Sequence, residues 1–139
     1  MEISDTLLDA VEFVESSNNP NAINKESGAR GAYQFLPIAW KDVVENYPST
    51  MKKYANYEDF SMDRGVSREF AKRLMQLNVK RLGKKANLDN VLASYNFGIG
   101  NVRKGHPIPP ETVEYIRKVR AKMSEKKLSG MLEMFGIKK

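Results

Sequence analysis

The first apolar residues of the chain recur at helical spacing. Leu7, Leu8 and Val11 form one stripe, while Asp5, Asp9 and Glu12 form a polar stripe on the other side. Ser4 precedes the stripe and is a typical N-cap residue. The Asn-Asn-Pro sequence at 18–20 is typical of a helix end. The pattern therefore predicts a first helix between residues 4 and 18.

Further helix patterns follow, separated by segments rich in Gly, Asn, Ser and Pro. They predict helices from Pro37 to Tyr47, from Ser67 to Leu82 with Gly83 as a left-handed cap, from Asn87 through Tyr95 with Gly98 at the end, and from Pro110 onward. Residues 18–36, 49–65 and 100–110 are predicted loops, the first with a possible short hairpin around residues 27–31. The sequence indicates a mostly α-helical, compact fold with little strand.

The length of 139 residues suits a single domain over residues 1–139. Residues from about 122 to 139 are amphipathic but weakly patterned, and we expect a loosely docked tail there. No apolar run reaches the roughly 20 residues of a membrane span, and the N-terminus lacks the pattern of a signal peptide. Nothing specifies an oligomer, so a monomer is the default expectation.

Charge and residue types narrow the chemistry. The chain carries 23 basic and 17 acidic residues, a formal charge of +6 that favours polyanions such as nucleic acid, anionic membrane or bacterial wall. Solvated helix faces also explain the basic runs at 72–85 and 117–127. There is no cysteine and only one histidine, His106. We therefore expect no metal site and no cofactor, and catalysis by carboxylates, hydroxyls or amides.

Glu15 is a carboxylate on the apolar side of the first helix. It follows Val11 by four residues and Leu7 by eight, so it falls within the arc that should face the core. Loss of water there favours the protonated carboxyl and raises its pKa, which suits a general acid near neutral pH. Alternatively, the helix frays at Ser16 and Ser17, and Glu15 reaches solvent.

Four segments resemble the soluble lytic transglycosylase family, a lysozyme-like group related to goose-type lysozymes. Residues 15–22 resemble its Glu-Ser and Asn-Pro-x-Ala segments, and residues 27–37 contain its Gly-Ala-x-Gly-x-x-Gln segment. Residues 93–98 resemble its Tyr-Asn-x-Gly motif, and residues 111–116 its Glu-Thr-x-x-Tyr-Val motif. The resemblance spans most of the chain, and the order of the segments is that of the family. It implies a lysozyme-like fold.

The resemblance also implies an activity. The substrate would be the glycan strand of peptidoglycan, cut between N-acetylmuramic acid and N-acetylglucosamine with formation of a 1,6-anhydro sugar. Glu15 would be the only catalytic carboxylate, because family chemistry uses the substrate's N-acetyl group to stabilise the cation. Delivery to the cell wall or periplasm would come from a phage particle, a secretion machine, lysis or a leader outside this sequence.

The supporting roles are implied motif by motif. Glu15 is the catalytic residue, with Gly31 and Glu111 supporting the site, and the implied substrate contacts are Ser16, Tyr33, Gln34, Tyr95, Asn96 and Tyr115. Two positions depart from the common pattern: Tyr33 stands where many members have Met, and Phe97 where many have Ala. Tyr95 and Tyr115 are also compatible with plain core aromatics, and Trp40 is predicted to be core.

Two rival functions remain open at this stage. A hydrolytic lysozyme would need a second carboxylate opposite Glu15, for which the candidates are Asp42, Glu45, Asp59 and Asp63. A non-catalytic basic module that binds wall polymer or nucleic acid is the other. Specific nucleic-acid binding is not expected, because the aromatic residues do not alternate with the basic runs.

Overall fold

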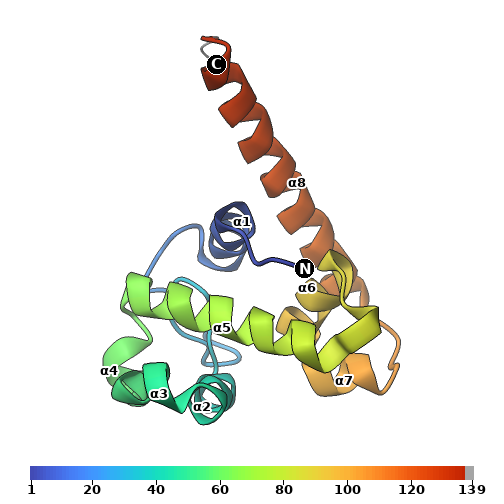
Figure 1. Ribbon diagram of the computed structural model, residues 1–139. Coiled ribbons are helices and arrows are strands. Elements are labelled where there is room, and N and C mark those ends of the chain that lie inside the picture. The colour runs from blue at the N-terminus through green and yellow to red at the C-terminus, as the bar shows by residue number, and fades with distance from the viewer. Residues whose placement is uncertain (137–139) are drawn as a thin grey trace.

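The computed structural model describes residues 1–136, and these residues form eight α-helices and two short 3-10 helices without a β-strand. Figure 1 shows their arrangement. The elements are α1 (Asp5–Ser16), α2 (Pro37–Asn46), α3 (Pro48–Met51), η1 (Lys52–Tyr54), α4 (Tyr57–Phe60), α5 (Arg64–Leu82), η2 (Gly83–Lys85), α6 (Leu88–Phe97), α7 (Ile99–Arg103) and α8 (Pro110–Met134). The predicted all-helical fold class is confirmed.

Capping residues set the ends of the main helices, largely as predicted. Ser4 accepts a 3.2 Å hydrogen bond from the Leu7 amide at the start of α1. Asn87 accepts a 2.8 Å bond from the Asn90 amide at the start of α6. Gly83, after α5, has φ of +57° as a cap glycine would, but its ψ of −121° lies outside the left-handed helical region. The helix boundaries thus follow from local chemistry.

Two predicted loops contain short helices, and one helix begins earlier than predicted. Residues 49–65 contain α3, η1 and α4, and residues 99–103 form α7. Helix α5 begins at Arg64 and not at Ser67, because the Asp63 carboxylate accepts a hydrogen bond from the Val66 amide and caps the helix earlier. One-turn helices escape sequence analysis because they are too short to display a period. The 18–36 loop has only isolated bridges of Arg30 with Ile23 and with Phe35.

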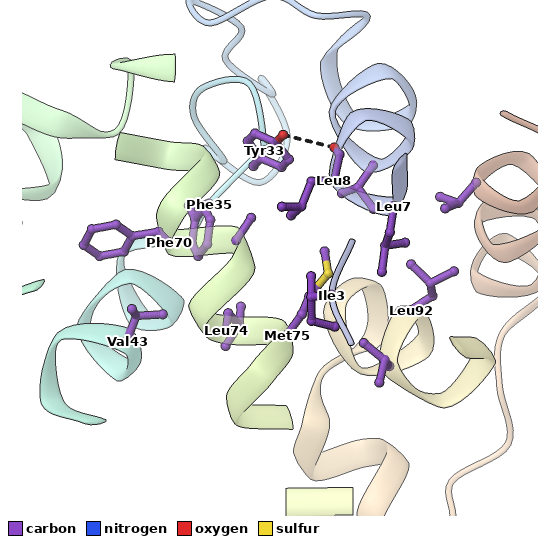
Figure 2. Packing of buried hydrophobic residues seen from close by; sticks show 14 of the residues in the cluster. Ile3, Leu7, Leu8, Tyr33, Phe35, Val43, Phe70, Leu74, Met75 and Leu92 are labelled. Carbon is purple, nitrogen blue, oxygen red and sulfur yellow. Dashed lines mark hydrogen bonds between the residues drawn. The ribbon is translucent and has the colours of Figure 1, made fainter. Parts of the chain in front are cut away.

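The core gathers aromatic rings from four segments, and Figure 2 shows part of it. Trp40 on α2 is stacked on Phe70 of α5 with ring centroids 3.5 Å apart, and Phe35 meets both rings edge-on. The Trp40 indole nitrogen donates a 2.8 Å hydrogen bond to the carbonyl of Tyr54. The prediction that Trp40 belongs to the core is confirmed, since 1% of its surface is exposed.

Helix α8 packs against α1 and α6. Thr112, Tyr115 and Val119 are its buried residues. The second half continues as helix to Met134 and extends beyond α1 (Figure 1). Lys126 still lies 3.7 Å from Asp9 of α1. The segment predicted as a loosely docked tail is therefore helical through Met134. None of the helices in residues 1–136 has the length and apolar character needed to cross a membrane.

Candidate active site

Glu15 lies in the last turn of α1, on the side that faces α6 and α8. Its side chain is only partly exposed. Burial removes water from the carboxyl and raises the pKa of Glu15 from 4.5 to about 8, and the Tyr115 hydroxyl lowers it slightly. The carboxyl is therefore protonated at neutral pH and can donate a proton, as a general acid must. The frayed helix end considered above is not observed, because α1 includes Glu15 and Ser16.

Two tyrosines share the surroundings of Glu15. Tyr115 from α8 is buried, and its hydroxyl makes no well-directed hydrogen bond within residues 1–136. It therefore interacts with the Glu15 carboxyl only loosely. Burial, followed by the negative charge of ionised Glu15, raises the pKa of Tyr95 and of Tyr115 well above the usual value. Both phenols thus keep their protons. The Tyr95 proton is donated to the Tyr33 carbonyl, so Tyr115 is the phenol available as a donor to Glu15.

Ser16 joins the end of α1 to the segment at residues 31–34. Its hydroxyl donates a 2.8 Å hydrogen bond to the Ala32 carbonyl and accepts one of 3.1 Å from the Asn19 amide. The predicted role was contact with the sugar. In the structure the Ser16 hydroxyl donates its proton to the backbone. This bond holds the end of α1, next to Glu15, against the segment at residues 31–34.

Gly31 allows that segment to pass close to the residues before α5. Its φ is +85°, and a Cβ added to it would lie 2.0 Å from the backbone oxygen of Ser61. Only glycine fits both the backbone conformation and this close approach. Gln34 follows with φ of +53°, and its Nε2 donates to the carbonyls of Gly31 (2.9 Å) and Ala22 (3.2 Å). The side-chain amide of Gln34 thus closes the turn internally.

Tyr33 does not line a groove, contrary to the prediction. Its side chain is fully buried, and its hydroxyl donates to the Leu8 carbonyl (Figure 2) and accepts from Arg68, each at 3.0 Å. The tight turn formed by Gly31 and Gln34 directs the ring into the core, where both polar needs of the hydroxyl are met. The backbone carbonyl of Tyr33 instead accepts a 2.7 Å hydrogen bond from Tyr95.

A groove of about 680 Å³ lies between α2 and the segment formed by α6 and α7. Its wall includes the predicted residues Gln34, Tyr95 and Asn96, together with apolar residues that sequence reasoning did not single out, Leu36, Ile38, Phe97 and Ile99. Glu15 is not part of this wall. Tyr95 connects the two, because its ring lines the groove while its phenol is close enough to feel the charge of Glu15.

Helix α8 is linked to α6 by a different residue from the one predicted. The Asn96 carbonyl oxygen accepts a 2.7 Å hydrogen bond from the hydroxyl of Thr112, which is buried. Glu111, the predicted link, is exposed and has no hydrogen bond or ion pair in residues 1–136. A helix starting at Pro110 turns Thr112 inward and Glu111 outward. The signal for Thr112 lay in the same motif, one position further on.

The polar stripe of α1 proved to be partly internal. Glu12 is 1% exposed and accepts two hydrogen bonds from Arg64 of α5, at 2.6 and 2.7 Å. Arg68 bonds Asp5 and Asp9. These pairs fix α1, the helix that carries Glu15, to α5. The sequence offered no signal for them, because the partners are more than 50 residues apart.

The candidate second carboxylates have other tasks or lie on the surface. Asp42 lines the groove and makes two hydrogen bonds to Arg81, at 2.7 and 2.8 Å. Asp63 caps α5, and Asp59 is exposed. Glu45 lines the groove, and its nearest cation is Lys41 at 3.7 Å. His106 is exposed, as predicted.

The geometry defines the class of protein as an all-helical domain with a buried, protonated carboxyl at the end of α1 and an open groove between α2 and α6–α7. The sequence model of the family described as Transglycosylase SLT domain matches residues 1–111, and the chain belongs to that family. The predicted family is thereby confirmed, and with it the lysozyme-like fold. Membership implies a transglycosylase that acts on peptidoglycan. Neither curated proteins nor solved structures yield a match to the chain.

Proposed function

We propose that this protein is a peptidoglycan lytic transglycosylase that cuts the β-1,4 bond between N-acetylmuramic acid and N-acetylglucosamine and leaves a 1,6-anhydro-muramic end. Glu15 is its single catalytic acid and base. The observation that supports this assignment is the pKa of about 8, caused by burial, at the end of α1 in a chain of the transglycosylase family. A carboxyl that stays protonated at pH 7 is ready to donate.

The reaction needs one proton donor that later becomes a proton acceptor. Glu15 gives its proton to the glycosidic oxygen as the bond to the muramic anomeric carbon breaks, and the N-acetylglucosamine side leaves as an alcohol. The carboxylate of Glu15 then takes the proton of the muramic 6-hydroxyl while that oxygen attacks the anomeric carbon. Glu15 regains its starting form, and no water is consumed.

The tyrosines beside Glu15 suit both halves of the cycle. The Tyr115 phenol remains protonated and offers a donor to the carboxylate that forms after proton transfer, which limits how far the pKa of Glu15 rises. Tyr95 contributes in a different way, because its bond to the Tyr33 carbonyl sets the position of Gln34. Tyr115 acts as the donor from α8.

The groove between α2 and α6–α7 is the proposed site for the glycan strand. Its wall combines aromatic and aliphatic surface from Tyr95, Phe97 and Ile38 with amides from Gln34 and Asn96. Sugars bind to such mixed walls, because their faces are apolar and their hydroxyls need partners. Ser16 supports the site from behind through its bond to Ala32. The enzyme acts at the cell wall or in the periplasm.

Mass spectrometry of the muropeptides released from purified peptidoglycan tests the proposal. The wild-type protein should release anhydro-muramic products, lighter by one water than hydrolysed ends. Glu15→Gln should release none while it still binds peptidoglycan, because the amide keeps the shape of the side chain and cannot donate a proton. Glu45→Gln and Asp42→Asn serve as matched carboxylate controls and should keep the anhydro product.

Other outcomes would point elsewhere. Reducing-end products, lost in Glu45→Gln or Asp42→Asn as well as in Glu15→Gln, would identify a hydrolytic lysozyme in which a groove carboxylate is the second catalytic group. Binding of peptidoglycan without any release by the wild-type protein would identify a binding module. Loss of both binding and cleavage in Glu15→Gln would contradict the catalytic assignment.

A further inference from the structure

A second cavity lies beyond α7, at the end of that helix away from the groove. It has a volume of about 410 Å³, and its wall comes from the end of α5, from η2 and α6, and from the loop after α7. The amides of Gly105 and His106 each donate a 3.1 Å hydrogen bond to carbonyls of α7, which turns the chain back after this helix. The side-chain amide of Asn90 donates a 2.7 Å bond to the carbonyl of Lys85 at the end of η2. Local hydrogen bonds therefore hold the wall of this cavity, the α7 cavity, in place.

The charge at the α7 cavity is positive. Lys85 and Arg103 line it without an ion pair in residues 1–136, and none of the described residues of its wall is an Asp or a Glu. The stretch from residue 80 to residue 110 carries six lysine and arginine side chains and one acidic residue, Asp89, which pairs with Arg120 at 2.6 Å. A concave wall of one charge concentrates the electric field, so the cavity attracts anions more strongly than a convex helix face would.

Part of the wall is apolar. Leu82 at the end of α5 is buried, Val102 of α7 is partly buried, and Ile108 keeps 36% of its surface exposed. A bare inorganic ion would leave these side chains in contact with water, whereas an organic anion with small apolar groups would cover them. No Phe, Tyr or Trp is among the described lining residues, so the bases of a nucleic acid would find no ring on which to stack. The wall therefore suits a carboxylate-bearing chain with small side chains.

The α7 cavity shares a wall with the groove. Arg81 lines the cavity, and its guanidinium donates hydrogen bonds of 2.7 and 2.8 Å to Asp42, which lines the groove. Likewise, Ile99 at the start of α7 lines the groove, and Arg103 at its end lines the cavity. Helix α7 has five residues and is roughly 7 Å long. Three extended peptide residues span roughly 10 Å, so a peptide attached to a ligand in the groove can reach the cavity.

Peptidoglycan carries a peptide of this kind. Each muramic acid bears a short stem that contains alanine methyl groups and free carboxylates, and its glycan strand is the proposed ligand of the groove. We infer that the α7 cavity binds this stem, with Lys85 and Arg103 on its carboxylates and Leu82 and Ile108 against its methyl groups. The inference rests on the proposed function, and it makes Lys85 and Arg103 determinants of specificity that take no part in the proton transfers.

Two substrates that differ only in the stem test the inference. Glycan strands that carry stems are compared with strands from which an amidase has removed the stems, and the rate of anhydro-muramic release is measured. Lys85→Gln/Arg103→Gln should lower kcat/KM on stem-bearing strands about tenfold relative to stem-free strands. Lys25→Gln/Lys52→Gln is the matched control, because it removes the same charge from two exposed lysines that line neither the groove nor the cavity. It should keep the wild-type ratio between the two substrates.

Binding of a free stem peptide tests the cavity without any cleavage. We expect L-alanyl-γ-D-glutamyl-diaminopimelate to shift the NMR amide signals of Gly105 and His106 in the full chain, and Lys85→Gln/Arg103→Gln to weaken this binding about tenfold. Inorganic phosphate at the same concentration should not displace the peptide. This measurement separates the two proposals, because a protein that releases no anhydro product can still bind the peptide.

Three outcomes would overturn the inference. One is an equal loss on stem-bearing and stem-free strands, because it would show that the two cations act on the glycan or on the fold. Another is a ratio between the substrates that Lys85→Gln/Arg103→Gln leaves unchanged. The third is a set of Gly105 and His106 signals that do not respond to the stem peptide, and a response to phosphate in its place would identify a site for small inorganic anions.

Discussion

The hydroxyl of Tyr95 donates a 2.7 Å hydrogen bond to the backbone carbonyl of Tyr33, and this bond fastens α6 to the turn that ends at Gln34. Tyr95 also lines the groove and feels the charge of Glu15. One phenol therefore connects the proposed catalytic carboxyl, the groove and the turn. Because Tyr33 points its own ring into the core, the turn can shift only if the core shifts with it.

We predict that Tyr95→Phe loses both stability and activity. The Tyr33 carbonyl would lose its partner in a mostly buried place, which costs about 1–2 kcal/mol of unfolding free energy. The turn before Gln34 would loosen, and the rate of cleavage should fall more than the affinity for peptidoglycan. Urea denaturation and the rate of muropeptide release measure the two effects. Tyr54→Phe is the control, since its hydroxyl has no hydrogen bond within residues 1–136, and it should change neither quantity.

The pH dependence of cleavage follows from the pKa of Glu15. A general acid must carry its proton when substrate binds, so kcat/KM should stay level through neutral pH and fall as the pH rises through about 8. The rate of release of anhydro products, measured at a series of pH values, checks this. A decline centred between pH 4 and 5 would show instead that the carboxyl is well solvated and has an ordinary pKa.

The same carboxyl makes stability depend on pH. In the folded protein Glu15 keeps its proton up to about pH 8, but in the unfolded chain it loses it near the ordinary value of 4.5. Between these values the folded state binds more protons, so the free energy of unfolding must fall as the pH rises. We expect a loss on the order of 2 kcal/mol between pH 5 and pH 8, less than the full 1.4 kcal/mol per pKa unit, because the carboxyl is partly exposed.

Glu15→Gln tests the origin of this slope. The amide cannot ionise, so the variant should become progressively more stable than the wild-type protein as the pH rises from 5 to 8. Urea denaturation of both proteins at several pH values gives the difference. Parallel curves would mean that other groups cause the pH dependence, and Glu111→Gln, a change at an exposed carboxylate of α8, should indeed run parallel to the wild-type protein.

Gly31→Ala should be far more harmful than the same change at Gly28. Both glycines have positive φ, +85° and +79°, but a Cβ on Gly31 would lie 2.0 Å from the Ser61 oxygen, whereas Gly28 has open space around it. Backbone strain alone costs about 1 kcal/mol, so Gly28→Ala should lose roughly that much. Gly31→Ala adds a backbone collision and should lose more than about 3 kcal/mol, measured by thermal or urea unfolding. Equal losses would contradict the close approach.

The sequence predicted those parts of the fold that depend on nearby residues. The caps at Ser4 and Asn87, the inward direction of Glu15 and the family itself could be recognised from local patterns. The direction of Tyr33 could not, because it depends on two positive φ angles, at Gly31 and Gln34. A local pattern gives the order of the residues, but it does not give the direction in which a turn points each side chain.

Long-range pairing was the second part that the sequence did not show. Helical periodicity assigned Glu12 to the solvent side. The carboxylate is buried because Arg64 of α5 forms an ion pair with it. Thr112 took the role expected of Glu111 for a similar reason, since the direction of the first turn of α8 depends on how that helix packs on α6. Burial of a charge is decided by its partner, and the partner lies elsewhere in the chain.

The ion pair between Glu12 and Arg64 supports one more prediction. Arg64→Ala would leave the Glu12 carboxylate buried without a partner, and such losses cost about 3 kcal/mol when a pair is broken from one side. Arg64 itself is largely exposed, so water can reach the vacated place and the expected loss is about 2 kcal/mol. Urea denaturation measures it.

Arg117→Ala is the matched control, because Arg117 also makes two hydrogen bonds to a glutamate, Glu114, but both side chains are on the surface. It should leave the unfolding midpoint unchanged. Because Glu12 and Glu15 share α1, loosening at Glu12 should also let water reach Glu15 and lower its pKa. Arg64→Ala should therefore move the alkaline fall in kcat/KM to lower pH, whereas Arg117→Ala should leave it in place. If Arg64→Ala lost stability but its kcat/KM fell at the same pH as in the wild-type protein, the ion pair would fix α1 without shielding Glu15 from water.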